Sequence, residues 1–169
     1  MLETIDLILD KAKPSDWKDM YRNVWSRPEA ARYMSWQLSH SEEEAQGRIL
    51  RTIEFQKSHD TYFVYEKSSG MPIGFAGVEE LAPGVYGEMG ICLGPEYVGK
   101  GFGKQILGCL IQYCRQELGA HEFVYSAREG NDASHGLAKS MGFTQTAVQP
   151  TVDHHDGSHY NLIKYSLKL

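Results

Sequence analysis

The segment Val85–Lys104 constrains the fold of this chain more than any other, because it joins an apolar strand, a glycine-rich turn and the start of an amphipathic helix. Gly99, Gly101 and Gly103 alternate through the turn, so its backbone can adopt conformations closed to other residues and approach a ligand directly. A helix that begins at Phe102 would add free N–H groups and the positive end of its dipole. The segment therefore predicts a site for a phosphorylated cofactor.

Two other common phosphate loops fit this turn poorly. A nucleoside-triphosphate loop needs Ser or Thr after its Gly-Lys pair to bind magnesium, whereas Gly103 and Lys104 are followed by Gln105. A dinucleotide loop reads Gly-x-Gly-x-x-Gly near the start of a strand–helix–strand unit, but this chain has Gly-x-Gly-x-Gly about a hundred residues in. Both classes of cofactor are disfavoured.

The interval 98–103 instead resembles the pyrophosphate loop of the GNAT N-acetyltransferase superfamily, Gln/Arg-x-x-Gly-x-Gly/Ala. Gly101 and Gly103 fit this pattern, and Val98 departs from it because Arg or Gln is usual there. Residues 88–91 are similar to the fourth strand of the family. Residues 131–143 are similar to its later helix, in the Asn-x-x-Ser form of ribosomal-protein N-terminal acetyltransferases. The three motifs occur in the family's order and extend the resemblance over most of the chain.

The resemblance implies transfer of the acetyl group of acetyl-CoA to a primary amine, on a small molecule or a peptide N-terminus. Relatives often place the general base where Glu88 stands, and many use a Tyr later in the helix as general acid. Because Ala138 occupies that position, Ser134 is the expected acid. Glu79 and Glu80 are weaker candidates for the base.

The base has a clear physical purpose. A lysine-like amine, with a pKa of about 10.4, is almost wholly protonated at neutral pH and cannot attack a thioester. A positioned base contributes roughly 10²- to 10⁴-fold, most effectively when burial lifts its pKa toward 7. The alternatives are a solvent-facing strand carboxylate for Glu88 and an ordinary first-turn helix residue for Ser134.

The resemblance also implies which residues hold the coenzyme. The strand edge at Ile91 and Leu93 would pair with the pantetheine amides, and a backbone N–H there would polarise the thioester carbonyl. Asn131 would cap its helix and face the coenzyme. The loop would supply the remaining contacts: Val98, Gly99, Lys100, Gly101, Phe102, Gly103 and Lys104. No metal is expected.

The remaining periodicity predicts an α+β fold in a single domain over residues 1–169. Helical spacing predicts helices over 16–26, from Ser41 onward with Ile49, Ile53 and Phe55 inside, over 102–118 and over 131–142. Apolar alternation predicts strands over 4–9, 61–66, 73–80, 85–93, 122–127, 144–152 and 160–167. The expected sheet is mixed and mostly antiparallel, with about seven strands and about four helices on its two faces.

Composition argues against several classes of partner. The net charge is −5 and basic residues do not form runs, so nucleic acid is disfavoured. No window approaches the ~20 apolar residues of a membrane helix, and no export signal opens the chain. Cys92, Cys109 and Cys114 are odd in number and lack ligand spacing, which favours the cytoplasm, and Cys92 is expected to pack rather than react.

Two clusters keep alternative interpretations. His154, His155 and His159 flank a turn whose register would place His154 opposite His159, and two imidazoles favour an exposed hairpin over a metal site. A histidine in this hairpin is also an alternative to Glu88 as the base, or a residue that lines the acceptor site. The aromatic residues between the first helices are either core or the border of the acceptor site: Trp25, Tyr33 and Trp36.

The competing function is a non-catalytic acyl-CoA-binding regulatory domain. Val98 and Ala138 support it, whereas Glu88 and Ser134 argue for catalysis. The sequence contains no motif that identifies the acceptor. The resemblance allows a homodimer that forms through the closing hairpin.

Overall fold

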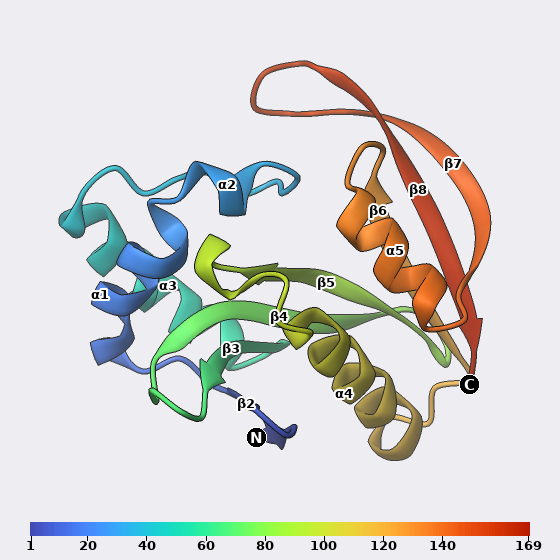
Figure 1. Cartoon of the computed structure of the whole chain (residues 1–169), viewed down its shortest axis with the longest axis horizontal. Helices are drawn as coiled ribbons and strands as arrows, with labels where there is room; N and C mark the ends of the chain where they lie inside the picture. Colours follow the sequence, from blue (N-terminus) through green and yellow to red (C-terminus); the bar gives the residue numbers. More distant parts are fainter.

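The computed structural model describes all 169 residues, and one eight-stranded sheet runs through it (Figure 1). In chain order the strands are β1 (Leu2–Glu3), β2 (Leu7–Asp10), β3 (Asp60–Glu66), β4 (Pro72–Ala82), β5 (Val85–Leu93), β6 (Glu122–Arg128), β7 (Thr144–Val152) and β8 (His159–Lys168). They lie in the order β1-β2-β3-β4-β5-β6-β8-β7, and only β5 and β6 run parallel. The predicted mixed, mostly antiparallel α+β fold is confirmed.

Helices cover both faces of this sheet (Figure 1). Along β3, Tyr62 and Val64 belong to one core while Phe63 and Tyr65 belong to the other, as alternation along a strand requires. The helical segments are η1 (Pro14–Asp16), α1 (Trp17–Met20), η2 (Tyr21–Trp25), α2 (Pro28–Ala31), α3 (Glu42–Gln56), η3 (Pro95–Tyr97), α4 (Phe102–Glu117) and α5 (Asp132–Ser140). The first core packs under α4 and α5, and the second packs under α1, η2 and α3.

The predicted helix over 16–26 is not one regular helix. It consists of the end of η1, the short α1 and a π-helical turn, η2. Asn23, Val24 and Trp25 are three consecutive buried residues, which a regular α-helical period does not place on one face. The wider turn directs all three inward, where the Asn23 side chain donates to the Pro72 carbonyl at 3.0 Å.

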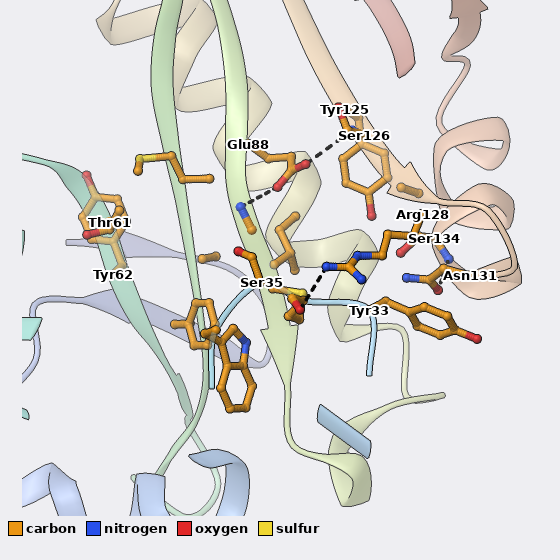
Figure 2. Close-up of a pocket in the computed structure, with 18 of the residues that line it drawn as sticks. Tyr33, Ser35, Thr61, Tyr62, Glu88, Tyr125, Ser126, Arg128, Asn131 and Ser134 are labelled. Atoms are coloured by element: carbon orange, nitrogen blue, oxygen red, sulfur yellow. Dashed lines mark hydrogen bonds between the residues drawn. The ribbon is translucent and has the colours of Figure 1, made fainter. Parts of the chain in front are cut away.

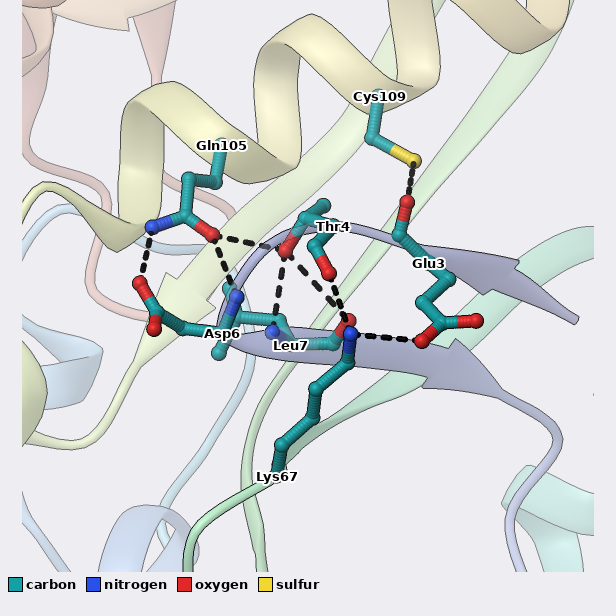
Figure 3. Close-up of polar contacts among 7 residues, drawn as sticks. All are labelled: Glu3, Thr4, Asp6, Leu7, Lys67, Gln105 and Cys109. Atoms are coloured by element: carbon teal, nitrogen blue, oxygen red, sulfur yellow. Dashed lines mark hydrogen bonds and ion pairs between the residues drawn. The ribbon is translucent and has the colours of Figure 1, made fainter.

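The predicted strand over 4–9 is also interrupted, and this accounts for the eighth strand. The Thr4 hydroxyl accepts a 3.0 Å hydrogen bond from the Leu7 N–H and so closes a turn between β1 and β2. Gln105 of α4 holds that turn by accepting from the Asp6 N–H at 3.1 Å and donating to the Asp6 carboxylate at 2.7 Å (Figure 3). Gln105 therefore anchors the first turn of α4 behind the glycine loop.

Two finer predictions are wrong. Val152, not His154, pairs with His159, because the hairpin turn begins after Asp153 and leaves His154 within it. Phe55 lies in the last turn of α3, is 43% exposed and stacks on the His59 ring at 3.7 Å between centroids. None of the helices combines the length and apolar character that crossing a bilayer requires.

Candidate active site

An opening between β5 and β6 creates the candidate site. The two strands pair only from Val85 opposite Glu122 to Gly87 opposite Val124, although both strands continue further. Beyond Gly87, the backbone edge of β5 that faces β6 has no strand partner. Such an edge offers N–H and C=O groups to an extended ligand.

Glu88 is the first residue of β5 beyond that short ladder, and its carboxylate spans the opening (Figure 2). One carboxylate oxygen accepts from the Ser126 N–H of β6 at 3.3 Å, and the other accepts from the Gly90 N–H at 2.5 Å. The second contact depends on a bulge, where β5 places two residues opposite Gly77 of β4. Gly90 has a φ of +96° there, which glycine adopts without strain.

Burial makes Glu88 a much weaker acid than an exposed glutamate. It raises the pKa of Glu88 to about 7, although the two backbone N–H donors favour the charged form. The negative charge of Glu79 adds to the rise. With a pKa near neutrality, this carboxylate can take up and release a proton at small cost in free energy, as a general base requires.

A cavity of about 720 Å³, which we call the central cavity, lies against Glu88 on the face covered by α3. It runs from α3 and β3 across β5 to β6 and α5. The residues that bear on its chemistry are Arg48, Thr61, Glu88, Tyr125, Arg128 and Ser134. Glu88 is the only carboxylate in its lining.

A second cavity of about 410 Å³, the loop cavity, lies at the glycine turn. Nine predicted coenzyme residues line it: Ile91, Leu93, Val98, Gly99, Gly101, Phe102, Gly103, Lys104 and Asn131. Lys100 does not, and its ammonium lies 5.2 Å from the centroid of the Tyr97 ring. Gly101 is the N-cap of α4 with a φ of +78°, and no atom lies within 4 Å of where its Cβ would stand.

The two cavities meet at six shared residues: Tyr33, Met34, Ile91, Tyr125, Asn131 and Ser134. The glycine turn lines only the loop cavity, and Glu88 lines only the central cavity. A ligand in one cavity would therefore meet a ligand in the other beside Ser134 and Tyr125, next to the opening that Glu88 spans.

Two hydroxyl groups stand at this junction (Figure 2). Burial raises the pKa of Tyr125 to about 12, and the Ser134 hydroxyl beside it offsets part of that rise. The Asn131 side chain accepts from the Ser134 N–H at 3.3 Å, so Asn131 caps α5 as predicted and leaves the Ser134 hydroxyl free of the cap. Either hydroxyl can donate a proton or a hydrogen bond toward the junction.

The loop between α2 and α3 covers the junction and is tied to the rest of the site. Arg128 of β6 donates to the Met34 carbonyl at 3.3 Å and pairs with Asp153 of the closing hairpin at 3.0 Å. The His155 Nε2 at the hairpin tip lies 2.6 Å from the Ser35 carbonyl oxygen. The hairpin therefore helps to enclose the central cavity. The molecule has no group of three or more His, Cys, Asp or Glu residues placed to hold a metal ion.

Other residues singled out from the sequence have different surroundings. Glu79 and Glu80 lie on the exposed end of β4 and line neither cavity. Burial raises the pKa of the Cys92 thiol to about 12, so this thiol stays protonated at neutral pH. All three early aromatic residues, Trp25, Tyr33 and Trp36, line the central cavity. Trp25 is also buried in the core.

Sequence reasoning missed Arg48, Thr61, Tyr125 and Arg128. Alternation along β6 was a usable signal for Tyr125, because it places a phenol on the buried face between Phe123 and Ala127. The other three residues come from separate elements and follow no local pattern, so only the folded chain brings them together.

Comparison with known proteins bears on this geometry. The family model described as "Acetyltransferase (GNAT) domain" matches residues 6–144. A search of curated proteins found no match to the sequence. This match assigns the chain to the class of acyltransferases that use a coenzyme A thioester. Within that class, the chain belongs to the GNAT family of acetyltransferases.

Solved structures share the fold at low sequence identity. A GNAT acetyltransferase from Bacillus anthracis matches with a TM-score of 0.84 and 14% identity, covering 99% of this chain and 97% of the other. The enzyme of Salmonella typhimurium that modifies the N-terminal serine of ribosomal protein L7/L12 matches with a TM-score of 0.77 and 20% identity, covering 98% of this chain and 96% of the other. RimL, a ribosomal L7/L12 alpha-N-protein acetyltransferase in complex with coenzyme A, matches with a TM-score of 0.80 and 18% identity, covering 98% of this chain and 96% of the other. The expected resemblance to ribosomal-protein acetyltransferases is confirmed at the level of fold.

The loop cavity fits the acetyl-CoA that this family uses. The turn leaves the Cβ side of both Gly99 and Gly101 open, and the N-terminus of α4 adds free N–H groups. The unpaired edge of β5 can hold the amides of the pantetheine arm. Acetyl-CoA supplies the activated acetyl group.

Proposed function

We propose that this protein transfers the acetyl group of acetyl-CoA directly to a primary amine, with Glu88 as general base and Ser134 as general acid. The observation that carries the proposal is the junction of the two cavities beside the carboxylate of Glu88. A coenzyme in the loop cavity and an amine in the central cavity would meet there. The chain's own residues supply binding, orientation and proton transfer around that point.

The loop from Val98 to Lys104 and the first turn of α4 would bind the pyrophosphate through backbone N–H groups. The edge of β5 at Ile91 and Leu93 would hold the pantetheine arm in line with the junction. One free N–H of that edge would stabilise negative charge on the thioester oxygen, which is worth roughly 3–4 kcal/mol in other acyl-transfer enzymes. Val98 offers no charged contact, so binding would rest on these N–H groups and on Lys104, which also lines the loop cavity.

Glu88 would remove the proton that keeps the acceptor amine from reacting. Its pKa of about 7 lies close to working pH, so a useful fraction is ionised and still basic. A peptide α-amine, with a pKa of about 8, demands less of this base than a lysine-like amine. The same carboxylate also accepts from the Ser126 N–H, so proton uptake by Glu88 is coupled to the hydrogen bond across the opening between β5 and β6.

Ser134 would protonate the departing thiolate, with the Tyr125 phenol supporting its hydroxyl. A thiol of ordinary pKa, about 8.5, leaves readily, so this step demands less of the protein than amine deprotonation. Cys92 takes no part as an acyl carrier because its buried thiol stays protonated. Attack by the amine on the thioester carbonyl is therefore direct.

The acceptor is a small-molecule amine or a peptide N-terminus. The neighbouring structures described as ribosomal-protein acetyltransferases support the second class. The loop and the hairpin tip that cover the central cavity support the first, because they limit its size. The competing function is a regulatory domain that binds acyl-CoA without turnover.

The test is thiol release from acetyl-CoA across a panel of small amines and peptide N-termini, with Glu88→Gln beside the wild type. We expect turnover with one class and a loss of roughly 10²- to 10⁴-fold in the variant, with acetyl-CoA affinity retained. Calorimetry measures that affinity, and thermal melting checks the fold, because glutamine can accept from only one of the two N–H groups. Tight acetyl-CoA binding with no turnover for any amine would favour the regulatory domain.

A further inference from the structure

Residues 33–36, which we call the strap, lie across the opening between β5 and β6. The strap belongs to no helix or strand, and all of its residues line the central cavity. Tyr33 and Met34 also line the loop cavity, so the strap covers the junction of the two cavities. The Met34 methyl group lies 3.2 Å from the point where a Cβ of Gly90 would stand. This contact places the strap against the bulge of β5 that follows Glu88.

Three consecutive residues of the strap are tied to groups on the other side of the opening. The Tyr33 hydroxyl donates to the Gly130 carbonyl, between β6 and α5, at 3.1 Å. The carbonyl of the next residue accepts from Arg128 at 3.3 Å, and the carbonyl oxygen after it lies 2.6 Å from the His155 Nε2. No backbone N–H donates to either carbonyl, so these two side chains are their hydrogen-bond partners.

Arg128 governs two of the three ties. Its Nη2 group also pairs with Asp153 at 3.0 Å, and both side chains are nearly buried, with exposed fractions of 15% and 13%. The second carboxylate oxygen of Asp153 accepts from the His155 N–H at 2.9 Å, and the ring of that histidine reaches the Ser35 carbonyl. The His155 N–H and then Arg128 lower the pKa of Asp153, so this carboxylate stays charged at neutral pH. The guanidinium therefore holds the strap directly and through the hairpin tip.

Arg128 is itself fixed by groups outside the strap. Its side chain extends from β6 toward the strap (Figure 2), and its guanidinium carbon lies 4.0 Å from the centroid of the Tyr160 ring on β8. Its backbone carbonyl oxygen lies 3.1 Å from the His135 Nε2 of α5. The Nδ1 of that imidazole lies 2.8 Å from the Tyr165 hydroxyl. Breaking the ties would therefore release the strap rather than Arg128.

The ties restrict which acceptors can reach Glu88. A cavity of about 720 Å³ holds a molecule of drug-like size, which can lie wholly beneath the strap. A longer chain must leave the cavity, and it cannot pass between the strap and the hairpin without breaking the ties of Arg128 and His155. The affinity for such a chain is reduced by the fraction of molecules in which the strap is open, whereas a compact acceptor meets no such reduction once inside.

We propose that Arg128 is a positioning residue that sets the size of the acceptor, because it holds the strap across the opening and so favours compact amines over peptide N-termini. This rests on the proposed function, since it takes the central cavity as the acceptor site. The strap acts on entry and enclosure, and the proton transfer by Glu88 is left as it is. Arg128 should therefore influence the KM of a long acceptor more than the kcat of a compact one.

The test compares amino-acid amides with hexapeptide amides that begin with the same residue, as acceptors with acetyl-CoA. For the preferred pair, we expect the wild-type kcat/KM to be about tenfold or more higher for the compact acceptor. Arg128→Met removes every donor and keeps an apolar chain beside Tyr160, and it should bring this ratio close to one through a lower KM for the peptide. Arg128→Lys should restore part of the preference. General damage to the fold would instead lower activity with both acceptors and leave the ratio unchanged.

Two neighbouring histidines provide a matched pair of milder variants. His154 and His155 are both exposed and line neither cavity, but only the His155 ring is bonded to the strap. His155→Ala should lower the compact-to-peptide ratio severalfold, and His154→Ala should leave it unchanged. An equal effect of the two histidine variants would overturn the proposal. So would a wild-type ratio near one, or a wild-type preference for the peptide.

Hydrogen exchange over residues 33–36 needs no acceptor and so separates this proposal from the proposed function. Arg128→Met should accelerate exchange in the strap about tenfold or more while α4 exchanges as in the wild type, and unchanged exchange would overturn the proposal. Equal turnover of both acceptor classes by the wild type would support the acetyltransferase and reject the role of Arg128. If no amine is acetylated, the proposed function fails. Selective binding of the compact amides in calorimetry, lost in Arg128→Met, would then still support the role of Arg128.

Discussion

The loop cavity and the central cavity differ in what builds them. The loop cavity lies where backbone groups are free to bind a ligand, at the turn that ends at Gly103, the free edge of β5 and the N-terminal ends of α4 and α5. The central cavity is formed by side chains from elements spread along the chain, among them Arg48 of α3, Glu88 of β5 and Ser134 of α5. Backbone groups recognise what every ligand of a class shares, and side chains distinguish its members.

The difference explains how one fold can keep a coenzyme and vary its acceptor. N–H groups at a glycine turn do not depend on the identity of neighbouring side chains, so Val98 can replace a charged residue while the cradle remains. A substitution at Arg48 or Glu88, by contrast, changes the charge that lines the central cavity. Coenzyme affinity and acceptor choice should therefore respond to different variants.

The largest expected effect is the pH dependence that Glu88 gives to the central cavity. A base must be deprotonated to act, so activity is lost as pH falls through the Glu88 pKa of about 7. The ratio of wild-type to Glu88→Gln activity should fall about tenfold for each pH unit below 7, or about a hundredfold at pH 5. Taking this ratio with one acceptor cancels the titration of the amine itself.

Acetyl-CoA affinity, measured by calorimetry over the same pH range, is the control for the loop cavity. The ratio of wild-type to Glu88→Gln affinity should stay level through pH 7, because Glu88 does not line that cavity and the titration of the coenzyme's own phosphate, with a pKa of about 6, cancels in the ratio. A fall in this ratio would mean that protonation of Glu88 closes the opening between β5 and β6, and the two cavities would then not be independent.

How much the sequence could predict follows the same division. The loop from Val98 to Lys104 and the cap at Asn131 are local patterns, and the structure places nearly all of their residues around one cavity. Lys100 is the exception, because its side chain lies over neighbouring aromatic rings rather than in the cavity. A lysine in a loop has too many rotamers for spacing to fix its direction.

The central cavity escaped prediction because its residues have no common local signal. Thr61 looks like an ordinary strand residue and Arg48 like a charged position on a helix. Their roles depend on which strands lie side by side and on the π turn that directs Trp25 inward. Glu88 was predicted because its strand leads into the glycine loop and because relatives of the family that the chain resembles often place the general base at that position.

A smaller effect should separate the loop cavity from the fold as a whole. Gly101 has a φ of +78°, where alanine costs roughly 1–2 kcal/mol. The Gly101→Ala loop is free to relax, because nothing lies near the new Cβ, and coenzyme binding must then restore the strained conformation. Acetyl-CoA affinity should fall about five- to thirtyfold by calorimetry, with the preference among acceptors unchanged.

Gly70→Ala is the matched control for that variant. Gly70 has a φ of +70°, also has no atom within 4 Å of its Cβ position, and lies in the turn between β3 and β4 outside both cavities. The strain is the same, so this variant should lower only the melting temperature. Equal acetyl-CoA affinities for the two variants would show that strain at Gly101 does not affect coenzyme binding.

The smallest expected effect belongs to the junction, which is part of both cavities. Ser134→Ala removes one hydroxyl without removing the cap of α5, because Asn131 accepts from the backbone N–H of that residue. The loss of one hydrogen bond to the leaving sulfur is worth about 0.5–1.5 kcal/mol, so kcat should fall about two- to tenfold. Tyr125→Phe should have a similar or smaller effect, since its phenol acts through Ser134. If the two hydroxyls serve the same proton, the double variant will lose little more than Ser134→Ala alone, whereas additive losses would assign them separate tasks on the two sides of the junction.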